Sequence, residues 1–493
     1  MTRSQVVIGL DVGTTAAKAS VFALDGSVRF TEQREYPLLS PQAGWHVQDA
    51  ETIAAGVLSA LAAAVARADG APVVAISVSS AMHGLLGLDR DRRPVTDILT
   101  WADSRAIEQA KRLARGPAGE RLHRQSGTPV HAMAPLAKLA WFNDHDPSLL
   151  RSTPSWVGLK DWVLAVLTGQ VVTELSTASG SGMADLALAE WSDEALELSG
   201  VRLDQLPVIL DTTEVLSLAA DAAGAIGLPA GTPVVAGAGD GPLGNLGTGA
   251  MVRGIAGLSI GTSGALRMAV PMPQVAPGLF CYALTRDVWV AGGAISNGGM
   301  VQRWLTATYA PGCDDAEACR RAEAIPAGSD GLVMIPYLVS ERASLWDPDI
   351  RGAFIGVRRP HTPDHFIRAG VEGVAIQLWT ILRRLRTITR VTEIRATGGV
   401  FRSPLWQQVV RGVLNRPTVV TGSAEGSGLG AAILGLVAVG AAESLSSGYD
   451  LLRGHEPEVR LEVSEADSAA YEHVRNRLPD LLEQYGDLSR TFV

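Results

Sequence analysis

The chain has 493 residues, of which 47% are hydrophobic and 19% charged, and its formal net charge is −9. A single hydrophobic core stops growing at about 250–300 residues, so we expect two large domains with a cleft between them. The negative charge argues against nucleic acid or an anionic membrane as the main partner. An anionic substrate therefore requires local clusters of positive groups and amide N–H donors.

Cysteine usage and apolar runs indicate a cytoplasmic protein. Cys281, Cys313 and Cys319 are too few, and odd in number, for a disulfide framework, so free thiols are expected. The first apolar run, Val6–Leu10, is too short for a signal peptide. The most membrane-like stretch, Leu429–Ala442, is shorter than the about 20 residues of a membrane span and predicts a buried helix.

The N-terminus predicts a strand–turn–strand unit. Gln5–Leu10 and Ala17–Ala23 are strand-like and flank a turn at Asp11–Thr15. The elements expected next are a third strand at 28–36, a helix at Glu51–Ala68 and a buried parallel strand at Val73–Ser79.

The same unit recurs halfway along the chain. Gly257–Ser263 repeats the pattern of Gly9–Thr15 at an offset of 248 positions (257 minus 9). This spacing is too long for a solenoid repeat, whose period is about 20–50 residues, and favours duplication of a whole domain over a chance recurrence. We expect an N-terminal domain over 1–248, a C-terminal domain over 249–445 and an outer helical tail over 446–493.

Both turns have the composition of phosphate-binding loops. In the first, Gly13, Thr14 and Thr15 can present backbone N–H groups and hydroxyls to an anion. Asp11 repels a phosphate unless Mg²⁺ lies between them, so it is the candidate metal ligand. The second loop, Gly261-Thr262-Ser263, has Ser259 in place of the acid. The alternative for each is an ordinary hairpin turn.

A glycine-rich segment after the strand-like 232–236 contains Asp240. Its GxGxxG pattern fits a dinucleotide site, but no Asp or Glu occurs between Gly241 and Arg286 to hold a ribose. We interpret Asp240 as the group that accepts a proton from an attacking hydroxyl. The alternative is a helix N-cap.

Polar residues that follow predicted strands can form a sugar pocket. Met82 and His83 come after Val73–Ser79, and Trp101, Asp103 and Arg105 follow soon after. The alternatives are a structural histidine and a helix start with a salt bridge. Two further groups of residues have other interpretations: Ser340–Arg342 with Leu345–Pro348 indicates a rigid loop, and Ala396–Ser403 with Gly426–Gly430 indicates an adenine pocket.

Together, and in this order along nearly the whole chain, these motifs resemble the FGGY carbohydrate kinases. The resemblance implies an α/β fold of two duplicated actin- or hexokinase-like (ribonuclease H-like) domains, with the active site in the cleft, and ATP and Mg²⁺ as cofactors. The roles that it implies are Asp240 as catalytic base, Asp11 with Gly13, Thr14, Thr15 and Lys18 for Mg²⁺ and phosphates, and Gly261, Thr262, Gly298, Gln302, Gly399 and Ser403 for the nucleotide.

Within the family, the sequence resembles gluconate kinases. The stretches that carry this likeness are Ser79–His83, Thr100–Arg105, Gly127–Met133, Phe280–Thr285 and Gly292–Met300. Xylulose kinases share Met82-His83-Gly84 and the Asp103/Arg105 pair. One departure is Glu174, where many relatives have Asp, and we expect it to alter a local cap or turn.

The expected reaction is ATP-dependent phosphorylation of a primary hydroxyl, most specifically of D-gluconate to 6-phospho-D-gluconate. A kinase of xylulose or another polyol is the alternative, and a non-catalytic actin-like nucleotide switch is a more distant one. Arg267, Arg105 and His131 are the candidate partners of a substrate carboxylate. The expected partner is a small sugar or sugar acid, without nucleic acid or membrane, and a homodimer is left open.

Overall fold

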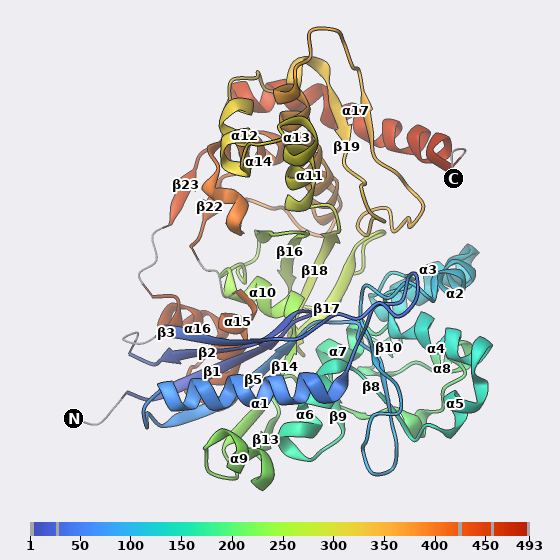
Figure 1. Ribbon diagram of the computed structural model, residues 1–493, viewed down its shortest axis with the longest axis vertical. Helices are drawn as coiled ribbons and strands as arrows, with labels where there is room; N and C mark the ends of the chain where they lie inside the picture. The colour runs from blue at the N-terminus through green and yellow to red at the C-terminus, as the bar shows by residue number, and fades with distance from the viewer. Residues whose placement is uncertain (1–3, 26–28, 423–425, 455–457, 491–493) are drawn as a thin grey trace.

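The computed structural model describes residues 4–25, 29–422, 426–454 and 458–490. The chain forms two stacked halves, each built on a mixed β-sheet flanked by helices (Figure 1). This confirms the α/β class and the two-domain organisation expected from the sequence. The N-terminal sheet lies in the lower half of Figure 1, and the C-terminal helix lies at the top.

The first sheet has the strand order β13-β14-β5-β1-β2-β3. Antiparallel pairing joins β1, β2 and β3, whereas β5 lies parallel to both β1 and β14. Its strands are β1 (Val6–Val12), β2 (Ala16–Ala23), β3 (Arg29–Glu35), β5 (Val73–Ser80), β13 (Val215–Ser217) and β14 (Pro233–Gly239). The three strands and the turn expected at the N-terminus are therefore present, with residue 28 outside the described residues.

Helix α1 (Ala50–Arg67) covers one face of this sheet, as Figure 1 shows. It begins where the Asp49 carboxylate accepts a hydrogen bond from the backbone N–H of Thr52 at 2.7 Å. By length and hydropathy this is the one helix among the described residues that is long enough to cross a membrane. Its apolar face, however, contributes Ile53 and Leu61 to the core of the first half, so it is a core helix.

The first half also contains short strands and helices inserted between the main strands. The short strands are β4 (Val47–Gln48), β6 (Leu86–Leu88), β7 (Ile98–Leu99), β8 (Ser155–Val157), β9 (Val172–Glu174), β10 (Ala184–Asp185), β11 (Glu190–Trp191) and β12 (Val208–Leu210). The helices are α2 (Ile107–Ala114), α3 (Gly116–Ser126), α4 (Pro135–His145), α5 (Pro147–Ser152), α6 (Leu159–Thr168), α7 (Leu175–Gly180), α8 (Asp193–Ser199), α9 (Ala220–Ile226) and α10 (Asp240–Gly247).

The second sheet repeats the topology of the first. Its order is β17-β18-β16-β15-β21-β22-β23, and β15 pairs antiparallel with β16 and parallel with β21. The turn after Val12 in β1 corresponds to the turn after Ile260 in β15. The strands are β15 (Ile255–Ile260), β16 (Gly264–Val270), β17 (Phe280–Thr285), β18 (Val288–Ile295), β21 (Glu393–Thr397), β22 (Thr418–Val420) and β23 (Val459–Leu461). The sequence repeat is thus a repeat of structure.

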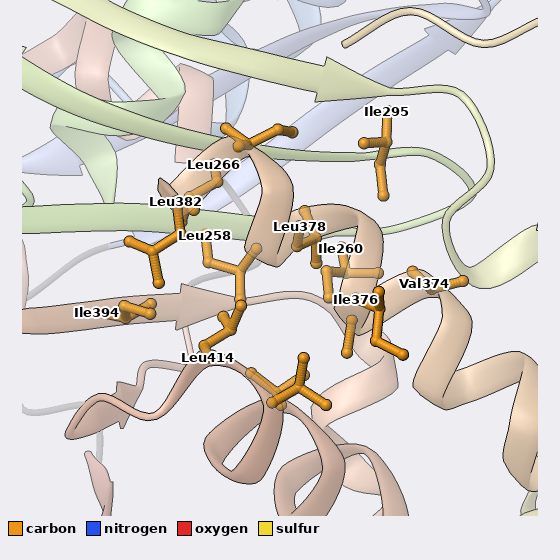
Figure 2. Packing of buried hydrophobic residues seen from close by; sticks show 14 of the residues in the cluster. Leu258, Ile260, Leu266, Ile295, Val374, Ile376, Leu378, Leu382, Ile394 and Leu414 are labelled. Atoms are coloured by element: carbon orange, nitrogen blue, oxygen red, sulfur yellow. The ribbon is translucent and has the colours of Figure 1, made fainter. Parts of the chain in front are cut away.

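Helices of the second half cover the outer face of this sheet. They are α11 (Gly299–Tyr309), α12 (Asp315–Ala322), α13 (Pro363–Leu385), α14 (Pro404–Leu414) and α17 (Glu465–Arg490), with a small sheet of β19 (Val333–Ile335) and β20 (Ala353–Ile355). Figure 2 shows Leu378 and Leu382 of α13 packed beside Leu258 and Leu266 of the sheet. The tail helix α17 packs on α14 and buries Tyr471.

Two helices pack against each other where the halves meet. Helix α10 follows β14 and lies between the sheets, since it packs against β14 and β5 of the first and against β16, β17 and β18 of the second. Helix α15 (Gly426–Ala438) packs against α10, β1 and β5, and α16 (Leu445–Leu452) follows it. Chain order and packing therefore differ here, because residues that follow the second sheet complete the core of the first.

Glycines allow this close packing. A Cβ on Gly9 would lie 2.0 Å from the carbonyl oxygen of Gly428, and a Cβ on Gly430 would lie 2.0 Å from that of Leu243. The backbones of β1, α10 and α15 thus approach closer than any side chain permits. Gly428 and Gly430 therefore serve helix and strand packing, and the interpretation of Gly426–Gly430 as part of an adenine pocket stays a prediction.

We predict that Gly430→Ala destabilises the protein by about 1–3 kcal/mol, because the new methyl group must displace the backbone of α10. Gly244→Ala is the matched control on the other helix of the same crossing, since a Cβ there meets no atom within 4 Å. Its helix propensity instead favours stability by up to about 1 kcal/mol. Denaturant unfolding of both variants measures the difference, and equal stabilities would contradict the close-crossing argument.

Candidate active site

A cavity of about 330 Å³ lies between the two halves. Residues of both sheets and of the loops beyond them line it: Thr14, Met82, His83, Trp101, Met133, Asp240, Gly241, Ser259, Gly261, Ser263, Gly264, Ala265, Arg267, Phe280, Tyr282, Ala294, Arg342 and Trp346. Most of the residues predicted for the sugar side and for catalysis are therefore brought together. Its walls combine aromatic faces with polar groups, as a carbohydrate site requires.

His83 lines this cavity as a neutral ring with its proton on Nδ1. Its Nδ1 lies 2.7 Å from the carbonyl oxygen of Gly180, which can only accept, so Nδ1 carries the proton. Burial lowers the pKa of His83 to about 3, and the ring is neutral at pH 7. The Nε2 atom is therefore a hydrogen-bond acceptor, suited to a substrate hydroxyl.

Asp103 and Arg105 do not line the cavity. The Arg105 guanidinium donates from Nε and Nη2 to the two Asp103 carboxylate oxygens, both at 2.8 Å, and lies 3.6 Å from the centre of the Trp45 ring. Asp103 also accepts from the backbone N–H of His46 at 2.9 Å. The pair is closed and buried, as in the structural alternative, and Arg105 is not available to a substrate carboxylate. His131 also stands outside the lining, with its ring against that of Trp346.

Asp240 stands at the first position of α10, where β14 ends. Gly239, and not Asp240, is the N-cap of this helix, although the Asp240 carboxylate accepts a hydrogen bond from the backbone N–H of Gly241. The pKa of Asp240 is raised to about 6: burial is the largest cause, the negative charge of Asp11 adds to it, and the positive charge of Arg267 opposes both. A carboxylate with a pKa near neutrality can accept a proton.

Two arginines face this carboxylate from the second half. Arg267 on β16 lies beside Gly241 and donates from Nη1 to Ser259 Oγ at 3.3 Å. Its Nε has no hydrogen-bond partner of normal geometry among the described residues. Arg342 contacts the Trp101 ring at 5.0 Å. The sequence reasoning missed Arg342 because it assigned this segment to a rigid loop.

The first predicted phosphate loop borders the cavity. Its carbonyl groups are occupied, since Gly13 O accepts from Tyr36 Oη at 2.6 Å and Thr14 O from Gln48 Nε2 at 2.7 Å. The hydrogen bonds of the described residues include none donated by the backbone N–H groups of Thr14 and Thr15 to another backbone group. The loop thus presents donors rather than acceptors, as an anion site requires.

Asp11 lies at the end of β1, opposite Lys18 in the β1–β2 register. Its carboxylate accepts from Ser79 Oγ at 2.8 Å. Burial raises the pKa of Asp11, whereas Ser79 and the Lys18 charge lower it. Asp11 forms no ion pair with another side chain among the described residues, and it belongs to no described cluster of three or more metal-ligating side chains.

A larger cavity of about 770 Å³ lies on the second half. Five of the predicted nucleotide residues line it: Gly261, Thr262, Gln302, Gly399 and Ser403. Gly261 lines both cavities, so the second predicted phosphate loop lies at their junction. Gly298 is not in this lining. A Cβ there would lie 2.6 Å from the Ser263 backbone, so Gly298 allows α11 to approach the loop.

Helix α7 connects several parts of the site. Its Ser176 Oγ accepts from the backbone N–H of Gly239 at 3.1 Å, and its Gly180 carbonyl accepts from His83. Glu174 caps the helix by accepting from the N–H groups of Ser176 and Thr177 and pairs with the buried Lys160. The Glu at 174 therefore anchors a cap, as its sequence position suggested.

Two facing α/β halves, with one cavity between them and a second beside the shared loop, define a two-domain sugar phosphotransferase of the actin and hexokinase fold. Residues 6–247 match the FGGY family of carbohydrate kinases, N-terminal domain, and residues 256–439 match its C-terminal domain. The chain belongs to the FGGY family of carbohydrate kinases.

Individual relatives agree with this assignment. The chain is 37% identical to the gluconokinase of Bacillus subtilis over 461 residues, which cover 90% of each chain. It is 30% identical to the xylulose kinase of the same species over 446 residues, 89% of each chain. The crystal structure of gluconate kinase from Lactobacillus acidophilus superimposes with a TM-score of 0.95 at 29% identity and covers 100% of both chains.

Proposed function

We propose that this protein is an ATP-dependent gluconate kinase, which transfers the γ-phosphoryl group of ATP to the 6-hydroxyl of D-gluconate. The observation that carries the proposal is the position of Asp240, whose pKa is about 6, where the polar and aromatic cavity meets the two phosphate loops. The greater identity to a gluconokinase than to a xylulose kinase supports gluconate over a pentulose.

The cavity on the second half fits a nucleotide. Its volume of about 770 Å³ suits a molecule of that size. Ser403 Oγ is buried there with the Cys319 thiol as its side-chain partner, and a polar ligand would supply a stronger one. Gly261, Thr262, Gln302, Gly399 and Ser403 would hold ATP, which supplies the phosphoryl group.

Asp11 fits Mg²⁺ as a single carboxylate ligand. Mg²⁺ in phosphotransfer sites commonly uses one or two carboxylates, water and substrate phosphates rather than a cage of protein side chains. The raised pKa of Asp11 marks a buried acid whose charge a cation would stabilise. When bound, the metal supplies Lewis-acid stabilisation of phosphate charge.

In the proposed reaction, His83 Nε2 accepts a hydrogen bond from the sugar, and the aromatic rings of Trp101 and Tyr282 bound its position. Asp240 orients the reacting hydroxyl and takes its proton as the new P–O bond forms and ADP leaves. The N–H groups of Thr14 and Thr15, with Lys18, stabilise negative charge on the transferred group. Arg267 keeps Asp240 ionised. We propose the cytoplasm, which contains ATP and these sugar acids, as the compartment.

We predict that ADP release in the presence of ATP and Mg²⁺ is fastest with D-gluconate when it is assayed in parallel with xylulose, ribulose and glycerol. The kcat/KM for gluconate should exceed the others by about 100-fold, because a site built for a charged group rejects analogues that lack it. A higher value for xylulose would favour the pentulose kinase. No ADP release with any substrate would favour the nucleotide switch.

We predict that Asp240→Asn lowers kcat by at least about 100-fold, because the amide cannot accept the proton. Calorimetric titration should still detect the binding of ATP and of gluconate to this variant. Asp221→Asn is the matched control, since Asp221 also lies in the first turn of a helix but is exposed, and its kcat should equal that of the wild type. Retention of kcat in Asp240→Asn contradicts the role as base.

We predict that kcat/KM falls about tenfold per pH unit below pH 6, since the base acts only when ionised and the pKa of Asp240 is about 6. The positive charge of Arg267 holds this pKa down. Arg267→Met should therefore move the acidic limb of the profile to higher pH. A limb that stays in place, or moves to lower pH, would contradict the electrostatic coupling of Arg267 to Asp240.

A further inference from the structure

Four cationic side chains stand at or near the sugar cavity within the described part of the chain, of which Lys138 is buried and the three arginines are half-buried: Arg105, Lys138, Arg267 and Arg342. A substrate with a carboxylate needs one of them. The two neighbouring histidines do not supply a charge at pH 7, because burial lowers the pKa of His83 to about 3 and that of His131 to about 4.

Two of the four cations are already satisfied by the protein. Arg105 is paired with Asp103 through two hydrogen bonds of 2.8 Å. Lys138 donates to the carbonyl oxygens of His83, Leu99 and Thr100 at 2.6, 3.2 and 2.8 Å, which uses all three protons of an ammonium group. Neither side chain lines the cavity.

Arg267 is committed to the reacting end of the cavity. Asp240 is the largest favourable charge acting on its guanidinium, and Arg267 lowers the pKa of Asp240 more than Arg342 does. A carboxylate beside Arg267 would compete with the catalytic acid for the same cation. It would also place the substrate carboxylate next to the hydroxyl that reacts, whereas in gluconate these groups are at opposite ends of the molecule.

Arg342 lies toward the two histidines. Its positive charge lowers the pKa values of His83 and His131, on which Arg267 is not among the causes, and also that of Asp240. Its guanidinium lies over the Trp101 ring. Its Nε donates to Ser296 Oγ at 3.2 Å and its Nη2 to the carbonyl oxygen of Ile295 at 3.0 Å. A guanidinium has five N–H donors. The two described hydrogen bonds use Nε and Nη2, so three N–H donors, including both on Nη1, can bind a ligand.

The neighbouring Glu341 does not neutralise this guanidinium by direct contact. Its carboxylate accepts from the backbone N–H groups of Ser296 and Arg342, at 2.7 and 2.8 Å, and from Asn297 Nδ2 at 2.7 Å. No ion pair within 4 Å joins its oxygens to the Arg342 side chain among the described ion pairs. These bonds instead fix the backbone of the segment that carries Arg342.

We infer that Arg342 binds the carboxylate of the sugar acid and thereby selects an aldonate over a neutral sugar of the same length. The inference rests on the proposed function and names the specificity-determining residue of that site. Ser296 and Ile295 fix the guanidinium of Arg342 by two hydrogen bonds at the cavity wall, and the Trp101 ring lies against it. Such a fixed fork can donate two parallel hydrogen bonds to a carboxylate.

The test compares gluconate with gluconamide, in which a neutral carboxamide replaces the carboxylate and the 6-hydroxyl is unchanged. For the wild type, kcat/KM should be about 100-fold greater for gluconate, as expected for a charge-assisted pair. In Arg342→Met this ratio should fall to about 1, because gluconate loses its partner while gluconamide does not. Arg342→Lys should give an intermediate ratio, since it keeps the charge without the fork.

Both kcat/KM values are measured on the same preparation of each variant, so partial misfolding lowers them by the same factor and leaves their ratio unchanged. Arg267→Met is the matched control: it should lower kcat/KM for both substrates and leave their ratio near that of the wild type. A wild-type ratio retained in Arg342→Met, or retained in Arg342→Lys if the first variant does not fold, overturns the inference. Absence of gluconate turnover in the wild type would instead contradict the proposed function itself.

Discussion

The site depends on the close crossing of α10 and α15 between the two halves. At this crossing Gly430 lies against the backbone of Leu243, and Gly9 of β1 lies against Gly428. Buried residues of both helices form one apolar cluster with Val7 of the first sheet and Val290 of the second. Because α10 begins at Asp240, the packing that joins the halves also places the carboxylate between them.

The shifted pKa values of the cavity side chains follow from this junction of the two halves. Each half alone would leave its polar groups in water, where a carboxylate keeps an ordinary pKa. Their apposition buries Asp240 beside Asp11 from the first half and Arg267 from the second, and its pKa rises to about 6. The same burial keeps His83 neutral. A duplicated fold has thus become asymmetric: one hairpin retains an acid, and the corresponding position of the other, Ser259, hydrogen-bonds an arginine.

Fixed hydrogen bonds behind the cavity hold these groups in place. Helix α7 accepts from the N–H of Gly239 and from His83, and it depends on Glu174, which caps it and pairs with Lys160. On the opposite side, Glu341 and Asn297 bind each other and hold the segment of Arg342. The functional side chains are therefore carried by short elements whose partners come from distant parts of the chain.

The sequence by itself determined the duplicated α/β fold and predicted the two phosphate loops and the catalytic acid, because each depends on local patterns: a glycine turn after an apolar strand, repeated at a fixed offset. It also identified Gly261, Thr262, Gln302, Gly399 and Ser403, which line one cavity. Only the tertiary structure decided which cations face the substrate. Arg105 and Asp103 neutralise each other out of the cavity, whereas Arg342 reaches it on a segment without a local motif. Charge pairing and burial are set by neighbours far apart in sequence, such as Ser296 and Trp101 around Arg342, and no local pattern encodes them.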